Sequence, residues 1–231
     1  LRQPSSTLMP PHSPMTATDI AAAGAEVVVM ATGSQPTETG FQRQLPLVAG
    51  LPGVHHRNVW TVEDVMAQRA RPGPRVIVLD DLGDWRGGGT AWHLAERGHA
   101  VTIVTAHPMV GFAVQRTAGD FELRACLARL GVAWYTESAI IEWTGTAAVV
   151  RSSLDGSELT LEADALVLAT TNTPITSVVD QLVAGGAVGE QEAVGMVFVV
   201  ERQQAMRRVG GAVRQRKVLH AVVMHPGLQC L

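Results

Sequence analysis

The sequence has 231 residues, of which 46% are hydrophobic and 17% are charged, so its length and composition fit one or two folded domains. The 18 Lys and Arg residues against 21 Asp and Glu residues give a net charge of −3, which excludes a globally basic nucleic-acid-binding protein. Because no apolar run reaches about 18 residues, we expect no membrane-spanning helix.

Cysteine usage is sparse. Cys126 and Cys230 are too few for a disulfide scaffold or a four-cysteine cluster. This usage fits a reducing compartment, and we expect a cytoplasmic protein with no nucleic-acid or membrane partner.

Residues 1–24 form an N-terminal segment that we leave unassigned, and the first interpretable segment follows them. Residues 27–33 form an apolar run that ends in small residues, which predicts a strand buried on both faces of a parallel sheet. The Gly- and Pro-rich residues 34–58 predict a loop. Thr61 and Asp64 then have the spacing of a helix capping box, so a short helix is expected after them.

The clearest unit follows this helix. Residues 76–79 predict a buried strand, residues 80–89 a Gly-rich turn, residues 90–97 a helix and residues 101–104 a second strand. A strand, a Gly-rich turn, a helix and a strand within about 30 residues make a βαβ unit, whose crossover should be right-handed.

The pattern changes after this unit. Residues 121–130 predict a helix, and residues 132–135 predict a third strand parallel to the two strands before it. Short strands and turn signals over residues 139–161 indicate an antiparallel meander. Residues 164–169 return to the buried-strand pattern of the first segment, whereas after Gly185 we expect only a strand at 196–200.

These elements predict an α/β protein with a Rossmann-like parallel sheet and a small antiparallel meander. Because two similar strands flank the βαβ unit, we expect an NAD(P)-binding-like domain at 70–162, inserted in a partial FAD-type domain made of 25–60 and 163–184. The tail at 186–231 stays unassigned. It is basic, since residues 201–231 hold six basic residues and one acidic residue, a net charge of +5.

The Gly-rich turn is the first candidate binding site. Glycines at such a turn let the backbone approach a pyrophosphate, to which the helix N-terminus presents free N–H groups. We therefore predict an adenine nucleotide, ADP or NAD(P)H, beside Gly83, Gly87, Gly88 and Gly89. The turn lacks a regular G-x-G-x-x-G, and its three aspartates would repel the pyrophosphate.

The end of the second strand holds the ribose position, where an acid would bind a 2′-hydroxyl and an arginine a 2′-phosphate. Thr105 stands there, so neither NAD nor NADP is favoured, and we expect weak binding. The eight histidines form no metal-binding motif, and no nucleophile motif occurs, so we predict neither metal ligands nor catalytic residues in this chain.

In their order, these segments resemble the C-terminal, nucleotide-binding region of the NADH:flavin oxidoreductases related to trimethylamine dehydrogenase and 2,4-dienoyl-CoA reductase. The similar segments are residues 27–33, 59–66, 75–81, 90–104 and 164–169. Together they span about residues 25–184.

The family places a flavin-bearing β/α barrel with an iron–sulfur cluster before two nucleotide-binding domains. The resemblance therefore implies that FMN and the cluster belong to an N-terminal barrel, missing here, as a partner domain or subunit. It also implies a FAD site lined by Ala31, Thr32 and Gly33, which is incomplete because the first G-x-G-x-x-G is missing. The degenerate turn resembles the amine dehydrogenase branch, in which this domain holds an adenine nucleotide without hydride transfer.

The resemblance implies the nucleotide-binding portion of an FMN/iron–sulfur oxidoreductase that acts on an amine or enoyl substrate. We expect the 231-residue chain to be inactive by itself. One alternative is a non-catalytic nucleotide-binding or interaction module, either a fragment or a frame-altered product. Another is a stand-alone FAD/NAD(P)H reductase of the disulfide-reductase type, which the absence of a C-x4-C pair disfavours.

Overall fold

The computed structural model describes residues 15–23, 27–186 and 218–221, which fall into two units. One unit combines residues 1–35 with residues 173–231, and the other is the continuous stretch 36–172. The chain therefore leaves the first unit and returns to it.

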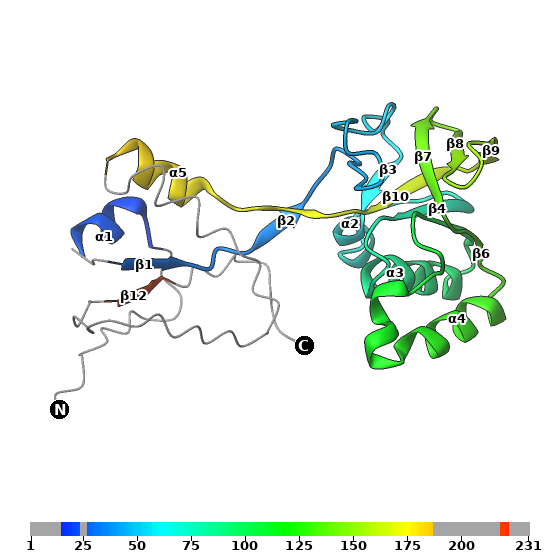
Figure 1. Ribbon diagram of the computed structural model, residues 1–231, viewed down its shortest axis with the longest axis horizontal. Helices are drawn as coiled ribbons and strands as arrows, with labels where there is room; N and C mark the ends of the chain where they lie inside the picture. The colour runs from blue at the N-terminus through cyan, green and yellow to red at the C-terminus, as the bar shows by residue number, and fades with distance from the viewer. Residues whose placement is uncertain (1–14, 24–26, 187–217, 222–231) are drawn as a thin grey trace. The chain divides into compact units, whose positions relative to one another are not determined.

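A five-stranded parallel sheet forms the centre of the 36–172 unit (Figure 1). Its strand order is β3-β10-β4-β5-β6, and every neighbouring pair is parallel. The predicted α/β fold and the predicted neighbours at 76–79, 101–104 and 132–135 are confirmed. The strands are β3 (Val59–Thr61), β10 (Ala165–Ala169), β4 (Arg75–Asp80), β5 (Ala100–Thr105) and β6 (Ala133–Tyr135).

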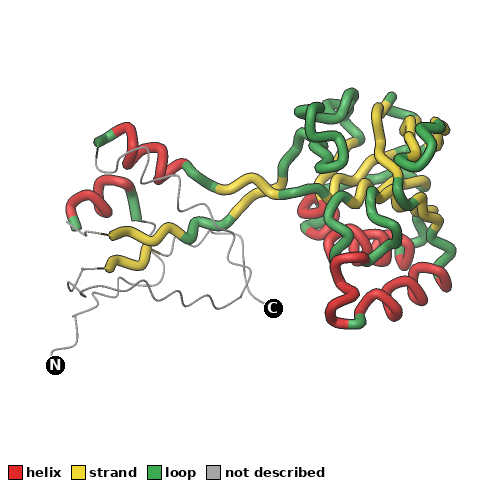
Figure 2. Tube along the Cα trace, viewed as in Figure 1, coloured by secondary structure: helices red, strands yellow, loops and turns green. Residues whose placement is uncertain are grey.

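Helices cover one face of this sheet and a meander covers the other. Figure 2 shows the helices gathered on one side of the unit. They are α2 (Val62–Met66), α3 (Trp85–Glu96), the 3-10 helix η1 (Phe112–Thr117) and α4 (Gly119–Arg129). The meander is the antiparallel sheet of β7 (Ser138–Trp143), β8 (Ala147–Ser152) and β9 (Glu158–Glu162), as predicted.

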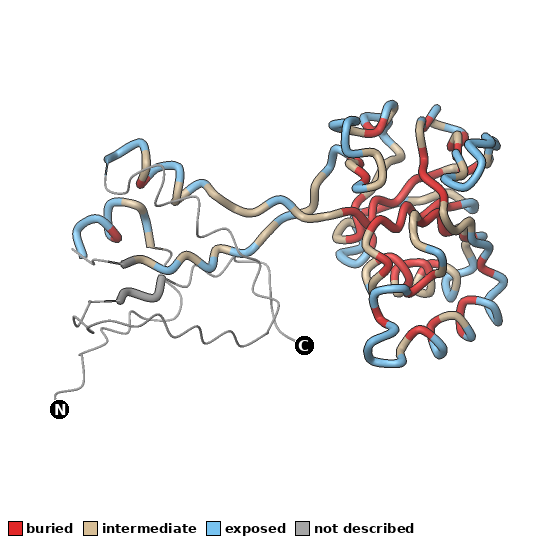
Figure 3. The backbone as a smooth tube through the Cα atoms, viewed as in Figure 1, coloured by how far each residue is buried: buried red, intermediate tan, exposed pale blue. Residues whose placement is uncertain are grey.

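The buried run in β4 shows why its sequence is continuously apolar. Val76 and Val78 pack with the helices, whereas Ile77 and Leu79 pack with Ile140 of the meander. Successive side chains on a strand point to opposite faces, so a sheet covered on both faces needs apolar residues throughout. Figure 3 shows the buried residues concentrated along these central strands.

Helix α3 begins earlier than predicted. The sequence predicts a helix over 90–97 after a Gly-rich turn, but the helix starts at Trp85 with Asp84 as its N-cap. The three glycines lie inside the helix, and the turn shrinks to residues 81–84. Glycine disfavours helix, so the prediction was wrong because close packing, described below, requires glycine there.

Two strands also belong to a different unit than predicted. β3 and β10 were assigned to a partial FAD-type domain, yet both lie in the five-stranded sheet, where β10 pairs with β4 and β3. The division between the units falls at 35/36 and 172/173. A buried parallel strand has the same continuously apolar sequence in either domain, so the sequence pattern alone does not show to which domain the strand belongs.

The other unit contains α1 (Ala17–Ala22), β1 (Val27–Met30), α5 (Ser177–Ala184) and β12 (Val218–Ala221). β1 and β12 pair in parallel, and Ile20 and Leu182 form the buried core of the described part. β2 (Ser34–Pro36) pairs with β11 (Asn172–Pro174) where the chain passes between the units. β12 gives the otherwise unassigned tail one strand, whereas the strand predicted at 196–200 lies outside the described residues.

Within the residues that the structure describes, no helix combines the length and the apolar character needed to cross a bilayer.

Candidate nucleotide site at the turn between β4 and α3

The turn at residues 81–84 lies at the carboxyl end of β4, with β5 on one side and β10 on the other. The chain continues from β4 through α3 to β5, whereas β10 returns on the opposite side. The backbone N–H of Asp81 donates to the carbonyl of Ala169 at 3.2 Å, so the ends of β4 and β10 are joined. Open α/β sheets bind ligands at such a point of reversal.

Gly83 holds the shape of this turn. It has φ +67°, and a Cβ built on it would lie 2.7 Å from Cδ2 of His107. Its carbonyl accepts a hydrogen bond of 2.9 Å from the backbone N–H of Ala113. The His107 ring in turn stacks on Phe112 with centroids 5.1 Å apart, so glycine is required here by both conformation and space.

The three predicted glycines of α3 are not equivalent. A Cβ on Gly87 would lie 2.3 Å from Oδ1 of Asp80, and one on Gly88 would lie 2.6 Å from Cδ2 of Leu123. A Cβ on Gly89 would meet nothing within 4 Å. Gly87 therefore allows the helix to approach β4, Gly88 allows it to approach α4, and Gly89 has no packing requirement.

Asp80 is the buried acid at the centre of the site. Its side chain has no exposure, and Oδ1 accepts a hydrogen bond of 2.9 Å from the backbone N–H of Gly83. Oδ2 is buried without a hydrogen-bond partner. Burial, assisted by the negative charges of Asp84 and Asp81, raises the pKa of the Asp80 carboxyl to about 7.

Asp81 has a partner that the sequence analysis missed. Its carboxylate accepts hydrogen bonds from the backbone N–H and from Nε of Arg43, both at 2.9 Å. Arg43 comes from the loop that follows β2, which carries no periodic pattern, so no sequence signal connected it to this turn. Among the described ion pairs, Asp81 thus has a cationic partner, whereas Asp80 and Asp84 have none.

The N-terminus of α3 is closed by side chains of this chain. Oδ1 of Asp84 accepts a hydrogen bond of 2.8 Å from the backbone N–H of Arg86. The Arg86 guanidinium pairs with Glu63 at 2.8 Å and donates to Oδ1 of Asn172 at 2.5 Å. The cation nearest to the helix N-terminus is thus already bound, as is one of the N–H donors.

Part of the backbone that would bind a nucleotide pyrophosphate is already hydrogen-bonded within this turn. The backbone N–H of Gly83 bonds Asp80 and that of Arg86 bonds Asp84, so two donors of the cradle are occupied by carboxylates. Thr105 is fully buried, and its hydroxyl accepts a hydrogen bond of 3.4 Å from the backbone N–H of His107. A nucleotide here would meet neither an acid nor a free hydroxyl at the end of β5.

The predicted FAD residues lie in the other unit. The Thr32 hydroxyl donates to the carbonyl of Ile175 at 2.6 Å, and the carbonyl of Gly33 accepts from the N–H of Ile175 at 3.1 Å. Gly33 has φ +76° and would admit a Cβ without contact. These bonds join the segments after β1 and β11, and the FAD role of Ala31, Thr32 and Gly33 stays a prediction.

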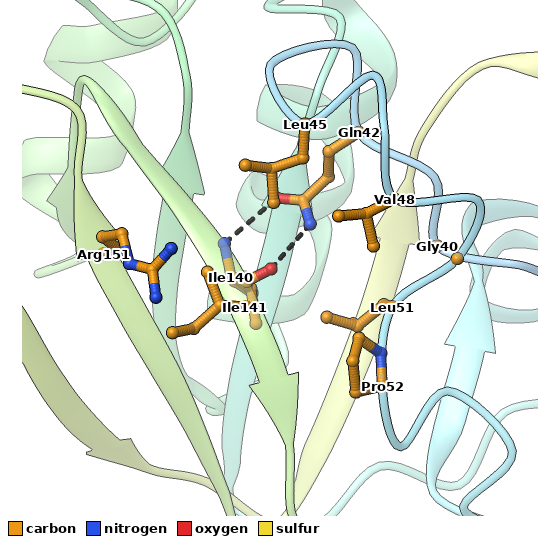
Figure 4. A pocket seen from close by; sticks show the side chains of 10 residues that line it. Gly40, Gln42, Leu45, Val48, Leu51, Pro52, Ile140, Ile141 and Arg151 are labelled. Carbon is orange, nitrogen blue, oxygen red and sulfur yellow. Dashed lines mark hydrogen bonds between the residues drawn. The ribbon is translucent and has the colours of Figure 1, made fainter. Parts of the chain in front are cut away.

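Two cavities of the 36–172 unit lie away from this turn. One of about 150 Å³ lies between the loop after β2 and strand β7, where the amide of Gln42 bonds both backbone groups of Ile140 (Figure 4). Its lining is apolar except for Gln42 and Arg151. Another, of about 490 Å³, lies beside β3 and is lined in part by Trp60. Neither lining includes a predicted site residue.

In the described part of the chain, no group of three or more His, Cys, Asp or Glu side chains is placed to hold a metal ion.

Comparisons with known proteins place this geometry among oxidoreductases. No family model and no curated protein sequence matches the chain. Among solved structures, histamine dehydrogenase from Rhizobium sp. 4-9 has a TM-score of 0.69 and 26% identity over 76% of this chain. The 6-hydroxypseudooxynicotine amine oxidase from Pseudomonas geniculata N1 has a TM-score of 0.67 and 26% identity over 81%.

A third similar structure, 2-naphthoyl-CoA reductase, has a TM-score of 0.58 and 22% identity over 79% of this chain, which supports the fold alone. The chain spans only 27%, 31% and 27% of these three proteins. The Rossmann-like α/β fold is confirmed. The resemblance to the amine dehydrogenases is supported at the level of fold and oxidoreductase class.

Proposed function

We propose that this chain is the nucleotide-binding portion of a flavin-dependent oxidoreductase that acts on an amine or an enoyl substrate. The observation that carries the proposal is the β4–α3–β5 unit at the point of strand reversal, in a chain 26% identical to an amine dehydrogenase and to an amine oxidase. The catalytic flavin and an iron–sulfur cluster then belong to a barrel domain or subunit that accompanies this chain.

Within this proposal the turn at 81–84 holds an adenine nucleotide weakly and takes no part in hydride transfer. The negative charges of Asp80 and Asp84 face the N-terminus of α3, where they oppose a phosphate. The backbone N–H groups of Gly83 and Arg86 already donate to these carboxylates, so they are less available to a ligand. The chain therefore supplies a nucleotide-binding scaffold, and substrate chemistry takes place at the flavin.

A second candidate function is a non-catalytic interaction module that has lost nucleotide binding altogether. The bond from the Gly83 N–H to Asp80 favours it, because this donor would otherwise face a phosphate. The two candidates differ in one measurable property, the affinity of the turn for ADP.

Calorimetric titration of the purified chain with ADP tests the proposal. We expect a dissociation constant of about 0.1 mM or weaker, which corresponds to about 5.5 kcal/mol, with no bound flavin colour and no NADH oxidation. Gly89→Asp is the matched variant, because it adds a negative charge near the helix N-terminus where a Cβ meets nothing within 4 Å. We expect it to weaken ADP binding several-fold.

Two results would count against the proposal. ADP binding that is absent at millimolar concentrations would favour the interaction module. A yellow preparation with one FAD per chain would show a complete flavin site within these residues and would contradict the expectation that the FAD site of this chain is incomplete.

A further inference from the structure

We propose that Asp80 is the specificity-determining residue of the turn between β4 and α3, and that its side chain weakens the binding of nucleotide phosphates by holding a donor that a phosphate would bind. The inference rests on the proposed nucleotide-binding character of this turn. It goes further by assigning the weak binding to one side chain, whose removal strengthens the binding of a phosphate ligand.

The Asp80 carboxyl group occupies the space in which a phosphate would bind. Oδ1 of Asp80 lies 2.9 Å from the backbone nitrogen of Gly83 and 2.3 Å from the point where a Cβ of Gly87 would stand. The carboxyl therefore fills the space between the turn and the first turn of α3. A phosphate bound at a helix N-terminus uses this kind of space and these backbone donors.

The negative charge of the Asp80 carboxyl group also opposes a phosphate. Its Oδ2 has no partner, and the site offers it no cation, since Arg43 is paired with Asp81 and Arg86 is paired with Glu63. Asp84 adds a further negative charge, and the His107 ring covers Gly83 from the other side. A buried, unpaired carboxylate repels an incoming phosphate strongly, because little water screens it.

Contacts that do not involve Asp80 also hold the turn. The Ala113 to Gly83 hydrogen bond, the His107 to Phe112 stack and the Arg43 to Asp81 ion pair hold the backbone from outside. Removal of the Asp80 side chain therefore frees the Gly83 N–H without dismantling the loop. The glycine that replaces it also matches the residue type that dinucleotide-binding turns use where the backbone approaches phosphate.

Titration of three single variants of the full chain with ADP at pH 8 and low salt tests this inference. Asp80→Gly removes both volume and charge, and we expect it to bind ADP at least about tenfold more tightly than the natural sequence, as one restored charge-assisted hydrogen bond allows. Asp80→Asn removes the charge and keeps the volume, so a smaller gain of about threefold is expected. Asp155→Asn makes the same charge change on the exposed meander, where the carboxylate accepts a hydrogen bond from Ser157, and should leave the affinity unchanged.

Adenosine and inorganic phosphate separate the parts of the ligand. Adenosine affinity should be equal in all four proteins, whereas inorganic phosphate should bind detectably to Asp80→Gly alone. A folded Asp80→Gly with the ADP affinity of the natural sequence would overturn the inference while leaving the proposed function intact. If Asp80→Gly does not fold, an unchanged affinity in Asp80→Asn overturns it instead. Absence of ADP binding in every protein, Asp80→Gly included, would refute the inference and the nucleotide-binding proposal together.

Discussion

Two strand-to-helix connections start at the carboxyl ends of strands in the parallel sheet, and they cap the helix that follows in different ways. Between β3 and α2 no residue intervenes, because Thr61 ends the strand and caps the helix. Between β4 and α3 the chain inserts four residues, with Asp84 as the cap. Both connections place an acid near the first turn of a helix, where negative charge is favourable.

The capping groups of the first connection bond each other. The N–H of Thr61 donates to the Asp64 carboxylate at 3.0 Å, and the N–H of Asp64 donates to the Thr61 hydroxyl at 3.2 Å. This reciprocal capping box occupies two backbone donors that a ligand could otherwise bind. In the second connection Asp80 is buried with one oxygen unpaired, an arrangement that lowers stability. The difference fits a folding role for β3–α2 and the binding role that we propose for β4–α3.

The largest expected effect comes from adding one methyl group at the second connection. Gly87→Ala places a Cβ 2.3 Å from the Asp80 carboxyl, so we expect a loss of about 3 kcal/mol in unfolding free energy. Gly89→Ala meets nothing within 4 Å and should stabilise the helix by about 0.5–1 kcal/mol. Urea unfolding followed by tryptophan fluorescence measures both, because all five tryptophans lie in residues 36–172.

A double variant identifies the colliding group. In an Asp80→Gly background the three atoms nearest to the new Cβ, all from the Asp80 side chain, are gone. Gly87→Ala should then cost little, which gives a large coupling energy between the two positions. Additive losses would show that the methyl group disturbs something other than Asp80.

The second expected effect is a pH dependence that Asp80 imposes on stability. Its pKa is raised to about 7 in the folded chain, against an ordinary value of 3.8, so the folded state retains a proton that the unfolded state releases. The stabilising contribution of the neutral acid is complete below the ordinary pKa and is lost as the pH rises to about 7. The loss amounts to about 2–4 kcal/mol.

Asp80→Asn removes this titration and keeps the shape of the side chain. The difference in unfolding free energy between the variant and the natural sequence should therefore change with pH. From pH 4 to pH 8 it should shift by about 2–4 kcal/mol in favour of the variant. Urea unfolding at several pH values between 4 and 8 measures the difference. A constant difference across this range would mean that Asp80 stays ionised in the folded protein, with a partner that balances its charge.

The sheet was predictable because burial on both faces leaves a clear pattern. Val76 and Val78 face the helices and Ile77 and Leu79 face the meander, so the strand is apolar at every position. The meander was predictable from turn signals at Gly145 and Gly156, both of which have positive φ. These features follow from local rules and appear directly in the sequence.

The candidate site was only partly predictable because its contacts are tertiary. Gly83, Gly87 and Gly88 were identified as glycines of a binding turn, but their need for space depends on His107, Asp80 and Leu123. The start of α3 was missed because helix propensity argues against three glycines in a row. The Arg43 to Asp81 pair joins residues 38 positions apart through a loop without periodicity, and no local pattern encodes such a contact.

The smallest expected effect compares the two helix caps themselves. Thr61→Ala removes the hydroxyl that accepts from the Asp64 N–H, so we expect a loss of about 1 kcal/mol. Asp84→Asn retains an oxygen for the Arg86 N–H and removes a charge that acts on Asp80, so it should leave stability unchanged or slightly raised at pH 8. The cap of the first connection thus contributes to stability through its bonds, whereas the charge of the second opposes the buried acid beside it. Urea unfolding at pH 8 decides between them, and a loss of 1 kcal/mol or more in Asp84→Asn, roughly the full value of a cap, would show that its charge stabilises the helix more than it repels Asp80.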